Sequence, residues 1–336
     1  MRNIIVLFFG LLFFLACRKE QQPGSVSEPL LNIPTGFPYP TIPQDNEVTE
    51  ARFALGKRLF YDVVMSRDST ISCASCHASE YAFSDTLAFS NGVAGLSGTR
   101  NAPTLTNVAY HPYFTREGGV PSLEMQILVP IQEHNEFDFN ILLISDRLKT
   151  DSNYIRMSWK AYGRDPDFYV ITRSIACFER CLISGDSPYD RYKFQGESNA
   201  LSPAALNGMN LFFSSKTNCA QCHFGFNFSN YAFENNGLYE EYSDPGKFRL
   251  TEDSTDLARF KVPTLRNIAL TAPYMHDGSL ETLQDVIEHY NYGGEAHPHK
   301  SPLVRPLGLT ALEKANLLEF LKSLTDENFI SNPKFK

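Results

Sequence analysis

The sequence predicts an all-α fold of two small helical domains with long loops. Amphipathic helical segments recur along the chain, and convincing β runs are few. One five-residue pattern, Cys-x-x-Cys-His, occurs twice, at Cys73–His77 and at Cys219–His223. Because the two copies fall in different halves of the chain, we expect one domain for each copy.

The Cys-x-x-Cys-His pattern is the attachment signature of c-type haem. Its two thiols bind the haem vinyl groups, and its histidine binds the iron from one face. A zinc site is the alternative, but it would use Cys-x-x-Cys pairs at closer spacing and no histidine directly after each. We therefore expect two covalent haem groups, attached at Cys73 and Cys76 and at Cys219 and Cys222, with the axial iron ligands His77 and His223.

The N-terminus has the features of an export signal. Arg2 precedes an almost wholly apolar run over 4–15, which is too short to span a bilayer as a stable helix. A small residue stands directly before Cys17, as in bacterial lipoproteins, so we expect a signal peptide over 1–17 and lipidation of Cys17. The alternative is an ordinary signal peptide that is removed together with Cys17. Covalent haem attachment outside the cytoplasm agrees with export, and a lipid-anchored periplasmic protein is expected.

The remaining chain has the composition of a mildly acidic, folded protein. It carries 30 Lys and Arg against 38 Asp and Glu, a net charge of -8, which argues against a nucleic-acid partner. Residues 18–45 form a flexible tether, since they are rich in Pro, Ser and Gly. An N-terminal haem domain is expected over 46–196 and a C-terminal haem domain over 197–336.

Helix signals are clearest in the second domain. Ser202 can cap a helix over 204–214, with Pro203 in its first turn. Further amphipathic helices are expected over 281–292 and 310–324, and Thr310 begins the last one with a capping box.

Two cysteines are left over by the signal and the haem patterns. Cys177 and Cys181 are four residues apart on one face of an expected helix, where a disulfide is sterically awkward. Buried free thiols are therefore the expectation.

Further sequence blocks carry a resemblance to a known family. They are Arg100-Asn101-Ala102-Pro103-Thr104-Leu105, the segment from Leu123 through Gln126 and Pro130 to Glu136, residues 176–192 with Phe178-Glu179-Arg180, and Val262-Pro263-Thr264-Leu265-Arg266-Asn267 continuing to Ala272-Pro273-Tyr274-Met275-His276-Asp277-Gly278. In this order the chain resembles the bacterial diheme cytochrome c peroxidase family, including its MauG branch, over nearly all of its length after the signal.

The resemblance implies a peroxide-cleaving first haem. Glu136 falls on the family's catalytic acid/base, and Gln126 on a glutamine that lines the same pocket; taken alone, Glu136 would be a surface carboxylate. Many relatives close this haem with a second histidine, but residues 78–105 contain none. We therefore expect an open or water-bound iron, with His111 as a less favoured ligand.

The second haem differs in its implied sixth ligand. Peroxidases of the family use methionine there, whereas Tyr290 occupies that position here, as tyrosine does in the MauG branch. Met275, His289 or an open site are the alternatives. A phenolate ligand would lower the reduction potential of this haem.

The resemblance also concerns the region between the haems. Arg116 stands where relatives place a tryptophan that helps electrons pass, and Tyr113 or Phe114 could substitute for it. The family's calcium site would use the Asn101 side chain and the carbonyls of Thr271 and Pro273, unless Asn101 only caps a turn. His297 and His299 are expected to be exposed loop residues rather than a metal cluster.

Three functions follow from these expectations. The first is a diheme cytochrome c peroxidase that reduces hydrogen peroxide to water at the N-terminal haem. Its electrons would arrive through the C-terminal haem from a small cytochrome c or a similar periplasmic donor. The second is a MauG-like diheme oxidase that uses high-valent haems on a protein or other substrate, and the third is a diheme electron carrier. Peroxidase is the favoured class, and a homodimer is possible.

Overall fold

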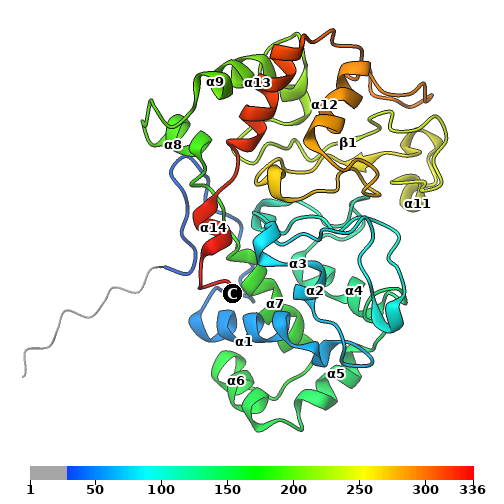
Figure 1. Ribbon diagram of the computed structural model, residues 1–336. Coiled ribbons are helices and arrows are strands. Elements are labelled where there is room, and N and C mark those ends of the chain that lie inside the picture. Colours follow the sequence, from blue (N-terminus) through cyan, green and yellow to red (C-terminus); the bar gives the residue numbers. More distant parts are fainter. Residues whose placement is uncertain (1–28) are drawn as a thin grey trace, which may run out of the picture.

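The computed structural model describes residues 29–336, and it has two helical halves joined side by side (Figure 1). The predicted signal peptide, Cys17 and the first part of the tether lie outside the described residues. The first half contains the helices α1 (Glu50–Tyr61), α2 (Cys73–Cys76), α3 (Leu123–Gln126), α4 (Leu128–Gln132), α5 (Ile141–Leu148), α6 (Ser152–Tyr162) and α7 (Phe168–Arg180).

The second half contains α8 to α14 and one short pair of strands. Its helices are α8 (Pro188–Phe194), α9 (Pro203–Phe212), α10 (Cys219–Cys222), α11 (Phe248–Thr251), α12 (Leu283–Tyr292), α13 (Ala311–Lys322) and α14 (Glu327–Ser331). The two-residue strands β1 (Phe233–Glu234) and β2 (Phe260–Lys261) pair antiparallel. Short 3-10 turns lie at Val63–Met65, Ser79–Tyr81, Val93–Gly95, Val108–Tyr110, Ser254–Asp256 and Ile268–Leu270. The helix-rich fold with little strand agrees with the predicted all-α class.

The three helices predicted in the second half all form, and each begins within two residues of its predicted start. The Ser202 side chain accepts a hydrogen bond from the Ala205 backbone at the start of α9, with Pro203 in the first turn. Thr310 and Glu313 form the predicted capping box of α13. The predicted helix over 281–292 begins at Leu283, because Thr282 caps α12 in a capping box of its own.

One pair of long helices forms the frame of each half, and in each pair a glycine lets the backbones approach closely. A Cβ atom on Gly56 of α1 would lie 1.8 Å from the Ser174 carbonyl oxygen of α7. A Cβ atom on Gly208 of α9 would lie 1.9 Å from the Asn316 carbonyl oxygen of α13. Both contacts are therefore possible only without a side chain.

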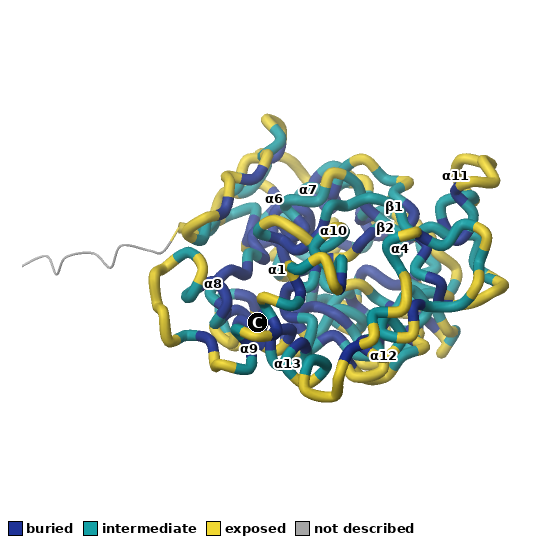
Figure 2. Tube along the Cα trace, turned by 90° about the horizontal axis from the view of Figure 1, so that it is seen from above, coloured by how far each residue is buried: buried dark blue, intermediate teal, exposed yellow. Residues whose placement is uncertain are grey.

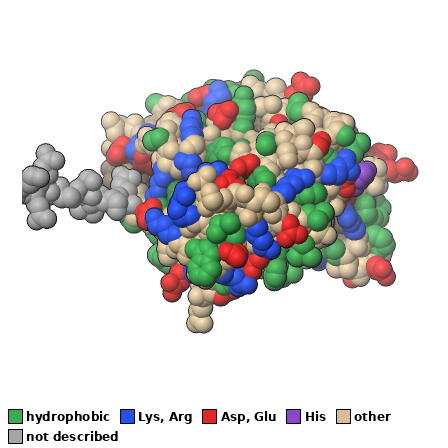
Figure 3. Space-filling model, turned by 90° about the horizontal axis from the view of Figure 1, so that it is seen from below, with side chains coloured by type: hydrophobic (Ala, Val, Ile, Leu, Met, Phe, Trp, Pro, Cys, Tyr) green, Lys and Arg blue, Asp and Glu red, His purple; other side chains and the backbone are tan. Residues whose placement is uncertain are grey.

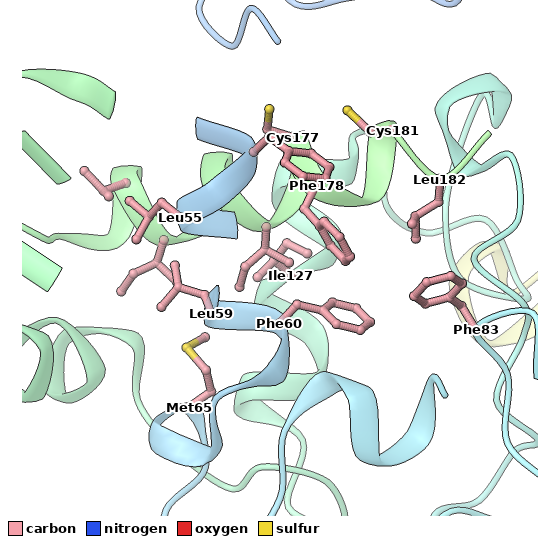
Figure 4. Packing of buried hydrophobic residues seen from close by; sticks show 14 of the residues in the cluster. Leu55, Leu59, Phe60, Met65, Phe83, Ile127, Cys177, Phe178, Cys181 and Leu182 are labelled. Atoms are coloured by element: carbon pink, nitrogen blue, oxygen red, sulfur yellow. The ribbon is translucent and has the colours of Figure 1, made fainter. Parts of the chain in front are cut away.

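Each half has its own buried hydrophobic cluster. Buried stretches of the chain lie inside the molecule, and exposed stretches lie mostly in its outer loops (Figure 2). Phe60, Phe83 and Phe178 meet in the first cluster, with centroid distances of 5.0 to 6.4 Å (Figure 4). Phe329 of α14 also packs on Phe83, at 5.7 Å, so the end of the chain returns to the first half. The domain boundary near residue 196 stays a prediction, and this returning segment adds to the first core.

The two remaining cysteines are buried and free, as predicted. Cys177 lies in α7 and Cys181 directly follows its last residue. Their sulfur atoms point away from the aromatic rings of the first cluster (Figure 4). Their spacing of four residues on one helix is unfavourable for a disulfide, in agreement with the free thiols.

The surface carries mixed charge on the face that Figure 3 shows. Basic and acidic side chains are interspersed there, without a single-sign patch. Within residues 29–336, no helix is both long enough and apolar enough to cross a membrane.

Gly56 provides a test of the close packing between α1 and α7. Gly56→Ala should lower the free energy of unfolding by about 1–3 kcal/mol, because the new methyl group overpacks the contact with Ser174. Helix propensity alone predicts the opposite sign, a gain of about 1 kcal/mol. Chemical denaturation measures the difference, and Gly98→Ala is the control, since a Cβ there has its nearest atom at 3.4 Å. A more stable Gly56→Ala protein would contradict this packing argument.

Candidate haem sites

Each Cys-x-x-Cys-His pattern forms a single helical turn that ends at its histidine. The helices α2 and α10 consist of the four residues from the first cysteine to the second, and His77 and His223 are their C-caps. The Nδ1 atom of His77 lies 2.9 Å from the Phe83 carbonyl oxygen, and Nδ1 of His223 lies 3.0 Å from the Phe228 carbonyl oxygen. When Nδ1 donates to a carbonyl, Nε2 is left unprotonated and able to bind a metal.

The two accepting carbonyls are held in unusual backbone conformations. Phe83 and Phe228 have φ angles of 59° and 49°, in the left-handed region that bulky residues rarely adopt. Both side chains are completely buried. Such a conformation persists where the surroundings enforce it, which is common at functional sites. Burial also lowers the pKa of His77 and of His223, so both imidazoles stay neutral, as metal ligands must be.

The first pattern opens into a cavity of about 390 Å³. Its walls include Cys73, Cys76 and His77 on one side and Gln126, Pro130 and Glu136 from the segment after α3. The Oε1 atom of Gln126 is buried and accepts no hydrogen bond from the described residues. Two free thiols, an available imidazole nitrogen and an unpaired polar atom around one cavity fit a covalently attached haem with a small ligand beside it.

Glu136 has the protonation behaviour of an acid/base group. Burial, together with the negative charge of Glu133, raises the pKa of Glu136 to about 7. A carboxyl with this pKa can both accept and donate a proton near neutral pH. The structure therefore brings the predicted catalytic residue, its glutamine neighbour and the first haem pattern to one cavity.

Pro130 determines the shape of this wall. Proline has no backbone N–H, so it cannot donate to the carbonyl of Gln126 four residues earlier. The helical segment is accordingly divided into α3, which ends at Gln126, and α4, which begins at Leu128. Counted from the N-caps Ser122 and Thr282, Pro130 occupies the same place in the first half as Tyr290 in the second. A side chain that cannot bind metal thus stands where the second half has a phenol.

His111 also borders the first cavity. Its Nε2 atom is buried and has no hydrogen-bond partner among the described residues. Burial lowers the pKa of His111 to about 3, which keeps the ring neutral. His111 packs against Tyr231 and Phe114, with ring centroids 5.2 and 6.2 Å away.

Tyr290 lies on α12 close to the second pattern. The charges of Cys219 and Cys222 contribute to the pKa of Tyr290, which burial raises to about 12. The competing side chains have other partners. The Met275 sulfur lies 3.2 Å from the Asn236 amide nitrogen, and His289 Nε2 lies 3.1 Å from the Asn236 carbonyl oxygen. Tyr290 also forms a side-chain hydrogen bond with Asn236, so all three side chains contact this residue, and Tyr290 as the ligand of the second iron stays a prediction.

The expected calcium donors do not form a free set of oxygens. Arg116 donates to the Asn101 carbonyl oxygen at 2.7 Å and to its side-chain Oδ1 at 3.1 Å. The other end of this amide, Asn101 Nδ2, donates to the Leu87 carbonyl oxygen at 3.2 Å, which fixes its orientation. A guanidinium on the only side-chain oxygen of the set does not fit a calcium ion at the same oxygen.

Several charged side chains with low exposure lie around the first cavity, and none of them was predicted from the sequence. Arg100 pairs with Glu117 and, at 2.6 Å, with Asp244. Glu179 also lines the cavity, and burial raises its pKa to about 8. Arg100 and Glu179 stand inside the quoted sequence blocks, but nothing in those blocks indicated their burial.

An internal repeat was the missed signal. Pro103-Thr104-Leu105 and Pro263-Thr264-Leu265 both follow a haem pattern and precede an asparagine with left-handed backbone, Asn107 or Asn267. Aligning the two segments pairs Asn101 with Lys261 and Arg116 with His276.

The late histidines are half-buried, which corrects the expectation of exposed residues. His297 Nδ1 lies 3.1 Å from the Asn235 amide nitrogen and accepts from the His299 backbone at 3.1 Å. No group of three or more His, Cys, Asp or Glu side chains in residues 29–336 is arranged to hold a metal ion.

Known proteins resemble this chain along most of its length. The family model for di-haem cytochrome c peroxidase matches residues 50–199. The methylamine utilization protein MauG of Methylorubrum extorquens is 34% identical, covering 88% of this chain and 83% of the relative. Cytochrome-c peroxidase IdrP1 of Denitromonas iodatirespirans is 32% identical, covering 86% and 85%.

Solved structures agree with these relatives. The crystal structure of a MauG-like protein associated with microbial copper homeostasis is 37% identical, with a TM-score of 0.87, covering 91% of this chain and 98% of that one. The diheme peroxidase BthA from Burkholderia thailandensis shares the fold at 20% identity, with a TM-score of 0.73. Two haem patterns, matching relatives over most of both chains and one shared fold lead to a single conclusion: the protein belongs to the di-haem cytochrome c peroxidase family, which implies two haem c groups.

Proposed function

We propose that this protein is a diheme c-type peroxidase that reduces hydrogen peroxide to two water molecules. The observation that carries the proposal is the position of Glu136 in one cavity with Cys73, Cys76, His77 and Gln126, together with its pKa of about 7. Electron transfer alone does not require a buried carboxyl group that exchanges protons near neutral pH beside a haem. The named peroxidases among the relatives support the same reaction class.

The chain's own residues supply binding and proton movement. Cys73 and Cys76 would hold the first haem and His77 would bind its iron; when bound, this group would supply the two electrons that peroxide reduction needs. The Glu136 carboxylate takes a proton from one peroxide oxygen and returns it to the other, which leaves as water. Gln126 Oε1 has no hydrogen-bond partner among residues 29–336 and accepts a hydrogen bond from the bound peroxide. Two further protons from solvent complete the second water.

The second site serves electron delivery in this proposal. Cys219 and Cys222 would hold the second haem, and His223 and Tyr290 would bind its iron. A small cytochrome c or a similar periplasmic protein is the proposed electron donor. The proposal includes export to the periplasm and a lipid anchor at Cys17.

A MauG-like oxidase is the second candidate, and Tyr290 is the observation that favours it. A tyrosine ligand would lower the reduction potential of the second haem and make it a poorer acceptor from a cytochrome donor. Turnover of peroxide with a reduced cytochrome c would support the peroxidase. Peroxide-dependent oxidation of a protein substrate without that donor would support the oxidase.

Calcium has no part in the proposed reaction. The resemblance implied it at Asn101, Thr271 and Pro273, but Arg116 already binds the Asn101 oxygens. The proposed steps therefore use no calcium.

Glu136→Gln should slow peroxide cleavage by about 10²–10⁴-fold, the scale of general acid/base help. In the unchanged protein, kcat/KM for peroxide should rise with pH through about 7 and then level off, since the carboxylate is the proton acceptor. Glu133→Gln is the matched control: it should keep the plateau rate and move the rise to lower pH, because a like charge is removed. An unchanged rate in Glu136→Gln would exclude this residue from the mechanism.

Tyr290→Phe should change the absorption and EPR signals of the second haem and leave those of the first unchanged, because only the second iron loses a ligand. Tyr292→Phe is the control on the same helix, where the side chain is 66% exposed. Identical spectra for Tyr290→Phe and the unchanged protein would remove Tyr290 as a ligand.

The resting first haem should be high-spin or water-bound, because Pro130 leaves the cavity side without a protein ligand. EPR of the oxidised protein measures this directly. Two purely low-spin haems would disprove the open site, and loss of a low-spin signal in His111→Ala would then identify His111 as the ligand.

A further inference from the structure

The contact between the two halves has a local pseudo-two-fold arrangement. The backbone N–H of Asn101 donates to the His276 carbonyl oxygen at 2.9 Å. The backbone N–H of Lys261 donates to the Arg116 carbonyl oxygen at 2.7 Å. Because Asn101 and Lys261 both stand two residues before the repeated Pro-Thr-Leu segment, these bonds occupy equivalent positions.

A side-chain cation occupies one side of this arrangement. The Lys261 ammonium donates to the Tyr113 carbonyl oxygen at 2.9 Å. The repeat pairs Tyr113 with Pro273, whose carbonyl the family resemblance assigns to calcium. The Tyr113 carbonyl, which is the repeat equivalent of the Pro273 carbonyl, is thus bound by the positive charge of Lys261.

Arg116 occupies the other side. Its Nε lies 3.1 Å from the Asn101 carbonyl oxygen, in addition to the two bonds from Nη2. Three hydrogen bonds from one guanidinium to a residue that is only 5% exposed make this a built contact. Asn101, Thr271 and Pro273 border the same cavity as Arg116.

The charges at this contact balance without an added ion. The cationic groups are Arg100, Arg116 and Lys261, and the carboxylates that face Arg116 are Glu117, Asp244 and Asp277. Two of these carboxylates are already paired with Arg100. A divalent cation beside Arg116 would add two uncompensated charges in a buried position, which is strongly unfavourable.

We propose that Arg116 is the fixed cation of this contact, that it takes the place where the family resemblance implies Ca²⁺, and that the protein holds no calcium there. The proposal also predicts the effect of removing Arg116, because the oxygens of Asn101, Thr271 and Pro273 would then lose its positive charge. Among the described residues, no backbone or side-chain donor bonds to the carbonyls of Thr271 or Pro273. Without the guanidinium, these carbonyls and the two Asn101 oxygens form an oxygen-rich set that suits Ca²⁺.

The first experiment uses the unchanged holoprotein. After gel filtration in chelator-treated buffer, elemental analysis should give an iron content of two per chain and no stoichiometric calcium. EGTA should leave the thermal midpoint unchanged. One calcium per chain, or a loss of stability with EGTA, would overturn the proposal without recourse to any variant.

The second experiment tests the position of the cation. Arg116→Ala should have a lowered thermal midpoint that calcium restores in the millimolar range, through preferential binding to the folded state. Elemental analysis should then find one calcium per chain. Arg156→Ala, an exposed charge change on α6, should show no calcium response. A folded Arg116→Ala protein that binds no calcium would show that these oxygens form no cation site, and it would overturn the assignment.

Metal content and the thermal midpoint alone decide both experiments, so their outcome does not depend on whether peroxide is the substrate.

Discussion

The hydrogen bond from each ligand histidine to a backbone carbonyl is the constraint on which the rest of the structure depends. His77 and His223 can present Nε2 to a metal only if Nδ1 is held elsewhere, and the carbonyls of Phe83 and Phe228 hold it. These carbonyls face the histidines because both phenylalanines have left-handed backbone and are fully buried. The aromatic cores around them, one in each half, therefore have a direct role in ligand geometry.

Starting from this shared geometry, single residues make the two sites chemically different. Pro130 cannot ligate a metal and interrupts the helix that lines the first cavity, whereas Tyr290 occupies the equivalent place on the unbroken α12. The first site thus keeps space for a small molecule beside Glu136, whereas the second site has the Tyr290 phenol at the equivalent position. In the proposed function, one repeated scaffold thus provides a reaction site in the first half and an electron-transfer site in the second.

The contact between the two halves is held by charged side chains in fixed positions. Arg116 binds the Asn101 carbonyl oxygen of its own half, and Lys261 binds the Tyr113 carbonyl oxygen of the opposite half. Arg100 pairs with the carboxylates of Glu117 and Asp244. Low dielectric strengthens such contacts and penalises any additional ion. An arginine at the position where the resemblance implies a tryptophan therefore changes the electrostatics of this contact.

Local signals in the sequence determined the capped helices α9, α12 and α13 and the family, and they predict the haem attachment residues and the ligand histidines, because each depends on residues close together in the chain. The resemblance also pointed to Glu136 and Tyr290. Only the tertiary structure decided the rest. It showed that Glu136 is buried enough to have a pKa of about 7, that Arg116 binds the oxygens expected to hold calcium, and that His297 and His299 are half-buried. The physical reason is that burial, pKa and the pairing of charges arise from neighbours distant in sequence, whereas attachment motifs and helix caps are local.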